Sequence, residues 1–258
     1  MKLSLSWIKD YVEIPEDMDL KKLAYDLTMS TVEVEDAEEL ARRFDKMIVG
    51  VIEKIEQHPN ADKLKVCKVD IGDGEIKDIV CGGSNIKEGL RVAVSQPGAI
   101  VRWHGEGEPV EIKNAKLRGV ESYGMICAST EIGLGDLFPL KEEAEILDLS
   151  DFDVPAGTPL ADALDMNDII LEIDNKSMTN RPDLWGHYGI AREIAAIYDW
   201  PLKEIEPIDI DVKSDFQVEI DAPERCSRYI GVEMSGVNVK SSPYNMQNRI
   251  WKARNASD

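Results

Sequence analysis

Three runs between residues 47 and 134 decide the fold of this chain: His58-Pro-Asn-Ala-Asp-Lys-Leu-Lys-Val-Cys67, Cys81-Gly-Gly-Ser-Asn85, and Leu117-Arg-Gly-Val-Glu-Ser-Tyr-Gly-Met-Ile-Cys127. Around them lie short apolar runs rich in Val and Ile, separated by Gly, Pro and Asn, at residues 48–55, 64–71, 76–81, 91–94 and 110–112. Apolar runs of this length between turn residues predict β-strands. Because no helical-period segment interrupts them, they predict a small closed barrel. Partly open five-stranded barrels commonly bind single-stranded or irregular nucleic acid.

The composition is that of an ordinary globular chain, but its charge is strongly acidic. The 258 residues are 43% hydrophobic and 31% charged, with a formal net charge of −20. A uniformly acidic surface would repel phosphates. Residues 47–140 hold 11 Lys and Arg against 14 Asp and Glu, however, so most of the acidic excess lies outside the expected barrel. The barrel can therefore carry a local positive face.

Two further stretches flank the barrel segment. Asp19 precedes Leu20, Leu23 and Leu27 at helical spacing, which predicts a helix with Asp19 as its N-cap. Because residues 1–40 are too few to bury a core, we expect them to pack on residues 169–198. There, residues 169–173 predict a strand. The run Asn180-Arg-Pro-Asp then predicts a helix with Asn180 as N-cap and Pro182 in its first turn.

The barrel segment resembles the tRNA-binding barrel, of the OB fold, that is attached to several aminoacyl-tRNA synthetases. The three runs quoted above carry this resemblance through the matching stretches HPNADKL, VCGGSN and AKLRGVES-GMICA. It implies tRNA contact through Lys and Arg toward phosphates and through Asn and Ser toward sugars or base edges. The candidate contacts are Asn60, Lys63, Lys65, Ser84, Asn85, Lys116, Arg118, Ser122 and Met125.

A more specific resemblance covers nearly the whole chain. The opening SLSWIKDYV, the run EIDNKSMTNRPDLWGHYGIAREIAAI at residues 172–197, and the start of a further domain resemble the N-terminal part of the bacterial phenylalanyl-tRNA synthetase β subunit. The implied fold is α+β with an inserted all-β OB-fold barrel. Residues 1–40 and 150–200 would form a discontinuous α+β domain, 41–149 the barrel, and 205–258 a linker and the truncated start of an editing-type domain. Within this last stretch, residues 243–251 predict an amphipathic helix.

The resemblance also implies partners. It predicts a cytoplasmic ligase that charges tRNA with phenylalanine, using ATP and Mg²⁺, in an α2β2 assembly whose α subunit contains the aminoacylation centre. No cofactor or metal is expected on this chain, and neither a membrane nor DNA is expected as a partner. Two alternatives stay open. One is a free-standing tRNA-binding or chaperone-like protein, and the other is a barrel that serves only oligomerisation.

Catalytic motifs are absent from the sequence. It contains no phosphate-binding loop, no H-E-x-x-H and no G-x-S-x-G, so we expect no catalytic residue here. His58, beside Pro59, favours packing or capping over catalysis, and His104 lies in a glycine-rich loop. For His187 we expect a hydrogen bond that holds the loop before Asn180. Four scattered cysteines without a C-x-x-C pair predict free thiols and no zinc site.

Overall fold

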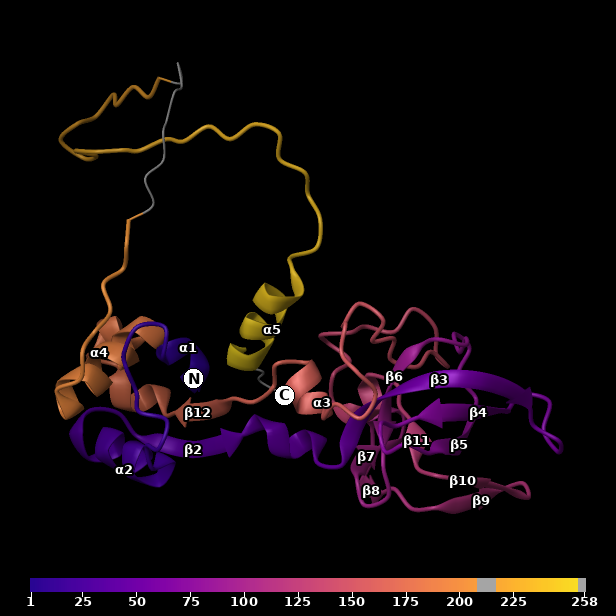
Figure 1. Cartoon of the computed structure of the whole chain (residues 1–258). Helices are drawn as coiled ribbons and strands as arrows, with labels where there is room; N and C mark the ends of the chain where they lie inside the picture. The colour runs from indigo at the N-terminus through magenta and orange to yellow at the C-terminus, as the bar shows by residue number, and fades with distance from the viewer. Residues whose placement is uncertain (208–216, 255–258) are drawn as a thin grey trace.

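A computed structural model describes residues 1–207 and 217–254. It contains a barrel next to a smaller unit of sheet and helices, in which the N-terminal segment lies beside residues from near 170–198 (Figure 1). The predicted domain at 205–258 falls partly on residues 208–216 and 255–258, which lie outside the described residues. No described helix is long and apolar enough to span a bilayer.

The barrel is an antiparallel five-stranded sheet in the order β11-β6-β3-β4-β5. Its strands are β3 (Met47–Gln57), β4 (Lys65–Asp70), β5 (Ile76–Cys81), β6 (Arg91–Ser95) and β11 (Met125–Ile126). Side chains that alternate along these strands point inward and form one buried cluster, which includes Ile52, Val69 and Ile79. Beyond β5 the sheet curls toward closure, because the Tyr123 N–H donates to the Asp78 carbonyl at 2.8 Å. The α+β fold with an OB-like barrel is confirmed.

One expected barrel strand was assigned wrongly. Residues 110–112 were expected to complete the barrel, but β8 (Pro109–Glu111) instead pairs with β7 (Ile100–Arg102) in a separate hairpin. All three residues of β8 are exposed, so this strand has no apolar face to offer a barrel interior. The fifth strand is β11, which pairs with β6.

The smaller unit is built from both ends of the barrel insertion. β12 (Ile169–Ile173) lies between β1 (Lys2–Ser4) and β2 (Val34–Glu39), antiparallel to both. The short helix α1 (Leu5–Ile8) follows β1. In the next helix, α2 (Leu20–Ser30), the Asp19 carboxylate accepts from the backbone N–H groups of Lys21 and Lys22, as an N-cap does.

A single hydrophobic cluster holds this unit together. Ile8, Leu23 and Leu27 from the opening segment are fully buried with Ala191 and Ile194 of α4 (His187–Tyr198). The expected packing of the first forty residues on 169–198 is therefore confirmed. The two segments are separated in sequence by the barrel, so each can bury its apolar face only when the chain on either side of the barrel comes together.

The helix expected from Asn180 onward is interrupted. Pro182–Leu184 form a separate 3₁₀ turn, and α4 begins only at His187, with Gly186 and not Asn180 at its N-cap. The helix is interrupted at Gly186, whose φ of 153° is not helical. The 3₁₀ turn then packs directly over Gly189, where only glycine leaves room for it, because a Cβ at this position would lie 2.0 Å from the carbonyl oxygen of Asp183.

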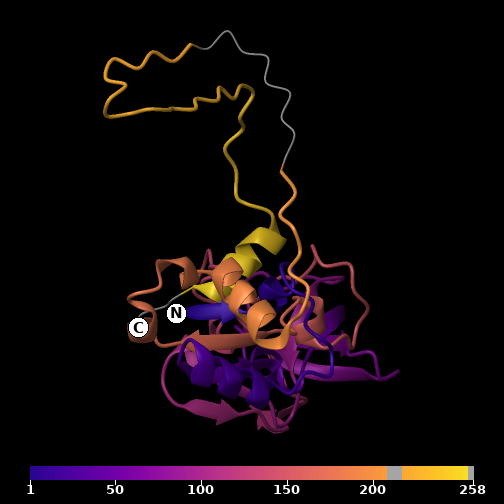
Figure 2. The same ribbon diagram turned by 90° about the vertical axis from the view of Figure 1, so that its left-hand side faces the viewer.

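The remaining elements are short. They are η1 (Leu40–Phe44), η2 (Trp103–Gly105), β9 (Ala115–Leu117), β10 (Val120–Ser122), η3 (Thr130–Ile132), α3 (Leu160–Ala163), η4 (Asn175–Met178) and α5 (Tyr244–Ala253). The last confirms the helix predicted at 243–251. Residues 217–243 contain no helix or strand and extend away from the rest of the described chain before α5 returns to it (Figure 2).

Candidate nucleic-acid interface

The β9–β10 hairpin is a separate two-stranded sheet beside the barrel, and it carries the exposed cations Lys116 and Arg118. Its two strands are joined by Arg118 and Gly119, whose φ angles are 46° and 98°. Two positive φ values are typical of the tight two-residue turns that match the twist of a hairpin. Glycine adopts this conformation freely, whereas arginine does so at some cost. The result is that the Arg118 side chain projects from the tip of the hairpin.

A second loop, formed by residues 58–64, is fastened to this tip. The Asn60 side-chain amide donates to the Arg118 carbonyl at 2.9 Å, and His58 Nε2 lies 3.1 Å from the Leu117 carbonyl. The Asn60 backbone N–H donates to His58 Nδ1 at 3.1 Å. Nδ1 is therefore an acceptor, so the proton of the neutral ring is on Nε2, which donates to Leu117. The packing role expected for His58, which is buried, is confirmed.

This fastening brings the basic residues of two separate sequence motifs to one end of the barrel. Lys63 belongs to the loop, while Lys116 and Arg118 belong to the hairpin, and all three side chains are exposed. Within residues 1–207 and 217–254, none of the three forms a salt bridge. Lys65 is half-buried and donates to the Gln57 side chain. Unpaired exposed cations are the groups that can neutralise phosphates.

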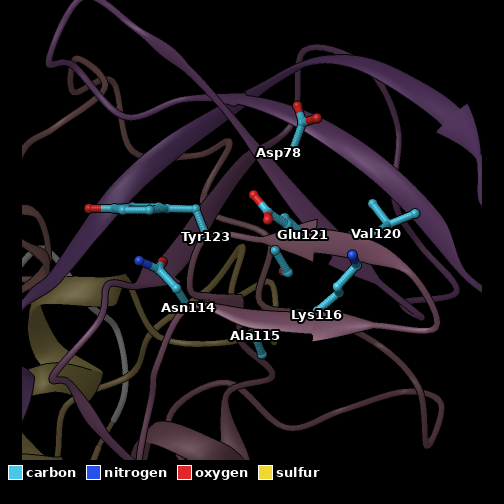
Figure 3. A pocket seen from close by; sticks show the side chains of 8 residues that line it. Asp78, Asn114, Ala115, Lys116, Val120, Glu121 and Tyr123 are labelled. Carbon is cyan, nitrogen blue, oxygen red and sulfur yellow. The ribbon is translucent and has the colours of Figure 1, made fainter.

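A groove of about 530 Å³ runs between the hairpin and β5 (Figure 3). Lys116 and Glu121 lie opposite each other on its floor, and Tyr123 and Asn114 lie at one end. Its lining is Asp78, Asn114, Ala115, Lys116, Val120, Glu121, Ser122 and Tyr123. The groove therefore mixes both charges with one aromatic ring, which suits shape recognition better than serial stacking of bases.

Several candidate residues are instead engaged within the barrel. Asn85 pairs with the backbone of Ile146 through both ends of its amide, each at 2.9 Å. The buried Ser122 hydroxyl accepts from the Val80 N–H at 3.0 Å and donates to the Gly124 carbonyl. Met125 is half-buried against a core cluster. Ser84 is exposed, but it lies in the loop that Asn85 fastens to residues 144–146. The sequence motifs thus combine surface residues with residues that hold the loops.

The other two histidines have different surroundings. His104 is exposed in its glycine-rich loop. His187 does not hold the loop before Asn180, so that expectation was wrong. Its Nε2 accepts from the Ser4 N–H at 3.1 Å, and its ring stacks on Trp7 at 4.2 Å between centroids. Since these partners lie 183 and 180 residues upstream, nothing in the local sequence indicates the contact. Burial lowers the pKa of His187 to about 4, which keeps the ring neutral.

The three thiols of the barrel are buried, and burial raises their pKa. Cys67, Cys81 and Cys127 are buried and unpaired, and Cys226 is exposed. Burial raises the pKa of Cys67 and of Cys127 to about 12. Within the part of the chain that the structure describes, no three His, Cys, Asp or Glu side chains are grouped as metal ligands would be.

Sequence comparison first defines the class of the barrel. Residues 47–159 match the family model described as "Putative tRNA binding domain". The barrel is therefore a tRNA-binding-type domain.

Comparison with curated proteins then extends the similarity to nearly the whole chain. It is 36% identical over 249 residues to the phenylalanine–tRNA ligase beta subunit of Cupriavidus pinatubonensis, which covers 94% of this chain and 29% of that protein. The beta subunits of Pectobacterium atrosepticum and Coxiella burnetii are each 38% identical, over 94% and 97% of this chain and 29% of their own lengths. The chain is homologous to the N-terminal region of phenylalanine–tRNA ligase beta subunits and spans less than a third of their length.

Among solved structures, a MetRS related protein from Pyrococcus horikoshii is 24% identical over 44% of this chain and 87% of that chain. Its TM-score of 0.30 is too low to inform the fold.

Proposed function

We propose that this chain supplies tRNA contact to a phenylalanine–tRNA ligase as the N-terminal region of its beta subunit. The observation that carries the proposal is that Lys63, Lys116 and Arg118 lie at one end of a tRNA-binding-type barrel as exposed cations that form no salt bridge with any described residue. Asn60 adds a polar group at the same place. These side chains would contact phosphates and sugars of folded tRNA, with little readout of base identity.

The proposal extends to partners and cofactors. The names of the relatives, each a beta subunit, support a second, alpha subunit, and the family resemblance implies an α2β2 assembly. ATP and Mg²⁺ would then be used by the complete cytoplasmic ligase and not held by this chain, whose sequence contains no phosphate-binding loop. A purified chain should accordingly show no phenylalanine-dependent exchange of pyrophosphate into ATP. Detectable exchange would contradict the placement of the aminoacylation centre elsewhere.

The proposed domain division follows from the same resemblance. Residues 1–40 and 150–200 would form one α+β domain and 41–149 the OB barrel, with the start of an editing-type domain from 205. The shared hydrophobic cluster of Ile8, Leu27 and Ile194 supports the first of these. A free-standing tRNA-binding protein would need only the barrel, whereas the match to the beta subunits covers 94–98% of the chain. The comparisons therefore favour the ligase over both alternatives.

The test is a charge reversal on the hairpin. Lys116→Glu together with Arg118→Glu should weaken binding of tRNA at low salt by about tenfold or more, because two phosphate contacts are replaced by repulsion. Lys21→Glu with Lys176→Glu is the matched control, since both lysines are exposed on the smaller unit and the net charge changes equally. Equal binding by the two double variants, with both folds intact by circular dichroism, would refute this surface.

A further inference from the structure

Helix α5 lies across the junction between the barrel and the smaller unit (Figure 1). Toward the barrel, the ring of Tyr244 stacks on Phe138 at 5.8 Å, and its hydroxyl donates to the Leu164 carbonyl at 2.8 Å. Toward the smaller unit, Arg249 pairs with Asp10 and lies over the ring of Trp7. The helix therefore contacts both parts of the molecule at once.

The inward side of α5 combines two aromatic side chains, Tyr244 and Trp251, which are half-buried against a core cluster, with two polar side chains that are more deeply buried. Asn248 and Lys252, one helical turn apart, are buried, while Met246 and Ile250 are 53% and 58% exposed. Asn248 donates to the Leu164 and Asp165 carbonyls at 3.2 and 3.3 Å, and its Oδ1 is buried with no partner among the described residues. The two most deeply buried side chains of α5 are therefore polar, whereas a helix within a hydrophobic core usually buries its apolar residues most deeply.

Lys252 meets an unusual carboxylate. Its Nζ lies 3.6 Å from Asp168 Oδ2 and 3.3 Å from Asp165 Oδ2. The Asp168 side chain is almost fully buried, and it accepts from the hydroxyls of Ser4 and Ser6, each at 2.6 Å. Asp168 thus holds the start of the chain in place. Removing the cation would leave its charge stabilised by neutral donors only, and a buried charge without its partner is costly.

Charge complementarity extends along the whole contact. Two basic side chains of α5 and that of Arg254, directly after the helix, pair with four carboxylates of the surface on which the helix lies. The pairs are Arg249 with Asp10, Arg254 with Asp136, and Lys252 with Asp165 and Asp168. In a chain of net charge −20, this acidic surface favours a basic partner.

We propose that this acidic face is a docking surface for a basic helix and that α5 occupies it as a reversible latch held by Lys252. Reversibility follows from the polarity of the two most buried side chains, because Asn248 and Lys252 are readily hydrated when they leave the surface, while Tyr244 and Trp251 are only half-buried. The segment 217–243, without helix or strand, allows α5 to leave while the rest of the chain stays folded. A docked latch fixes the barrel relative to the smaller unit through Asp136 on one side and Asp10 on the other. The proposal does not depend on tRNA binding.

Limited trypsin digestion of the intact chain, followed by mass spectrometry, tests docking. Lys240 is exposed in the extended segment and serves as the internal reference, whereas Arg249 lies in the docked helix. In the wild type, cleavage after Arg249 should be about tenfold or more slower than after Lys240, since proteolysis follows the open population. Equal rates at the two sites would overturn the proposal.

Variants then test the role of Lys252. Lys252→Gln should raise the Arg249 cleavage rate to within about threefold of the Lys240 rate. Lys87→Gln, a loss of the same charge at an exposed barrel position, should leave the ratio unchanged. Asp165→Asn removes the exposed partner of Lys252 without touching the core and should raise the rate to a smaller extent. An unchanged ratio in both Lys252→Gln and Asp165→Asn would refute Lys252 as the lock.

Hydrogen exchange of the wild type tests reversibility. The amides of α5 should exchange through local opening, faster than those of β3 and β4 and with little dependence on low denaturant concentrations. Exchange of α5 only together with the barrel core would show that the helix is a permanent part of the fold and would overturn the latch.

Discussion

The Asn60 side chain donates its amide to the carbonyl oxygen of Arg118 at 2.9 Å, across 58 positions of sequence. Together with the hydrogen bond between His58 and Leu117, this contact joins the 58–64 loop and the tip of the β9–β10 hairpin into one surface. The hairpin tip carries the charge, and the neighbouring loop fixes where that charge is presented. Positioning by short hydrogen bonds to backbone is what a preformed phosphate-binding surface requires.

Asn60→Ala should release the hairpin tip with a small loss of global stability. One hydrogen bond to a backbone carbonyl contributes about 0.5–1.5 kcal/mol, so the melting temperature should fall by a few degrees at most. Hydrogen exchange in residues 115–122 should rise by more than exchange in β3 and β4. Asn114→Ala, at an exposed neighbour whose side chain forms no hydrogen bond in the described chain, is the control. Equal hairpin protection in the two variants would count against the fastening.

The salt dependence of tRNA binding should be shallow. Lys63, Lys116 and Arg118, with Lys65 partly available, permit two to four phosphate contacts. At roughly 0.7–0.9 per contact, the slope of log K against log salt concentration should be about −1.5 to −3.5. The Lys116→Glu/Arg118→Glu variant should show a slope closer to zero. A slope steeper than about −6 in the wild type would require a larger basic surface than this one.

Gly189→Ala should destabilise the chain, although helix propensity alone predicts a gain of about 1 kcal/mol. The added Cβ would lie 2.0 Å from the Asp183 carbonyl, so the 3₁₀ turn must move. Overpacking of this kind typically costs about 1–3 kcal/mol. Urea unfolding measures the change. Ala196→Gly, at an exposed position of the same helix, gives the ordinary propensity effect, and a stabilised Gly189→Ala variant would disprove the close contact.

Stability should decline as the pH falls from about 6.5 toward 4. The folded-state pKa of His187 is about 4, below the unfolded value near 6.5, so the unfolded chain binds the additional proton in this window. Burial is the main cause, and Nε2 must also stay unprotonated to accept from the Ser4 N–H. His187→Gln keeps an acceptor but does not titrate. Its melting temperature should therefore fall less than that of the wild type between pH 6.5 and 5, and parallel curves would contradict the assignment.

Only one of the four thiols should react quickly in the folded chain. Cys226 is exposed, whereas the other three thiols are buried. Burial raises the pKa of Cys67 and Cys127 to about 12 and also raises that of Cys81, so these three thiols stay protonated at pH 8. An aromatic disulfide reagent should therefore show one fast equivalent, followed by three more only on unfolding. Cys226→Ser should remove the fast phase. A second fast equivalent in the native chain would show that the barrel opens more readily than its packing suggests.

The sequence was sufficient for the class of fold, because that information is local. The period-two apolar runs and their Gly and Pro boundaries specify strands, and Asp19 before Leu20 specifies a helix start, each within a few residues. The three motifs likewise placed Lys116 and Arg118 among the candidate contacts.

Tertiary structure decided everything that depends on partners distant in the chain. The fifth barrel strand is residues 125–126 and not 110–112. Residues 125–126 pair with β6 and bury the side chain of Ile126, whereas all three residues of β8 are exposed. Asn85 and Ser122 have the residue types of a binding surface, but their amide and hydroxyl groups are engaged by backbone groups that no local pattern indicates. His187 meets Ser4 and Lys252 meets Asp168 for the same reason. Hydrogen bonds and ion pairs of this kind form between groups that folding buries next to each other. Which groups become neighbours depends on the whole folded chain, so a short stretch of sequence does not reveal it.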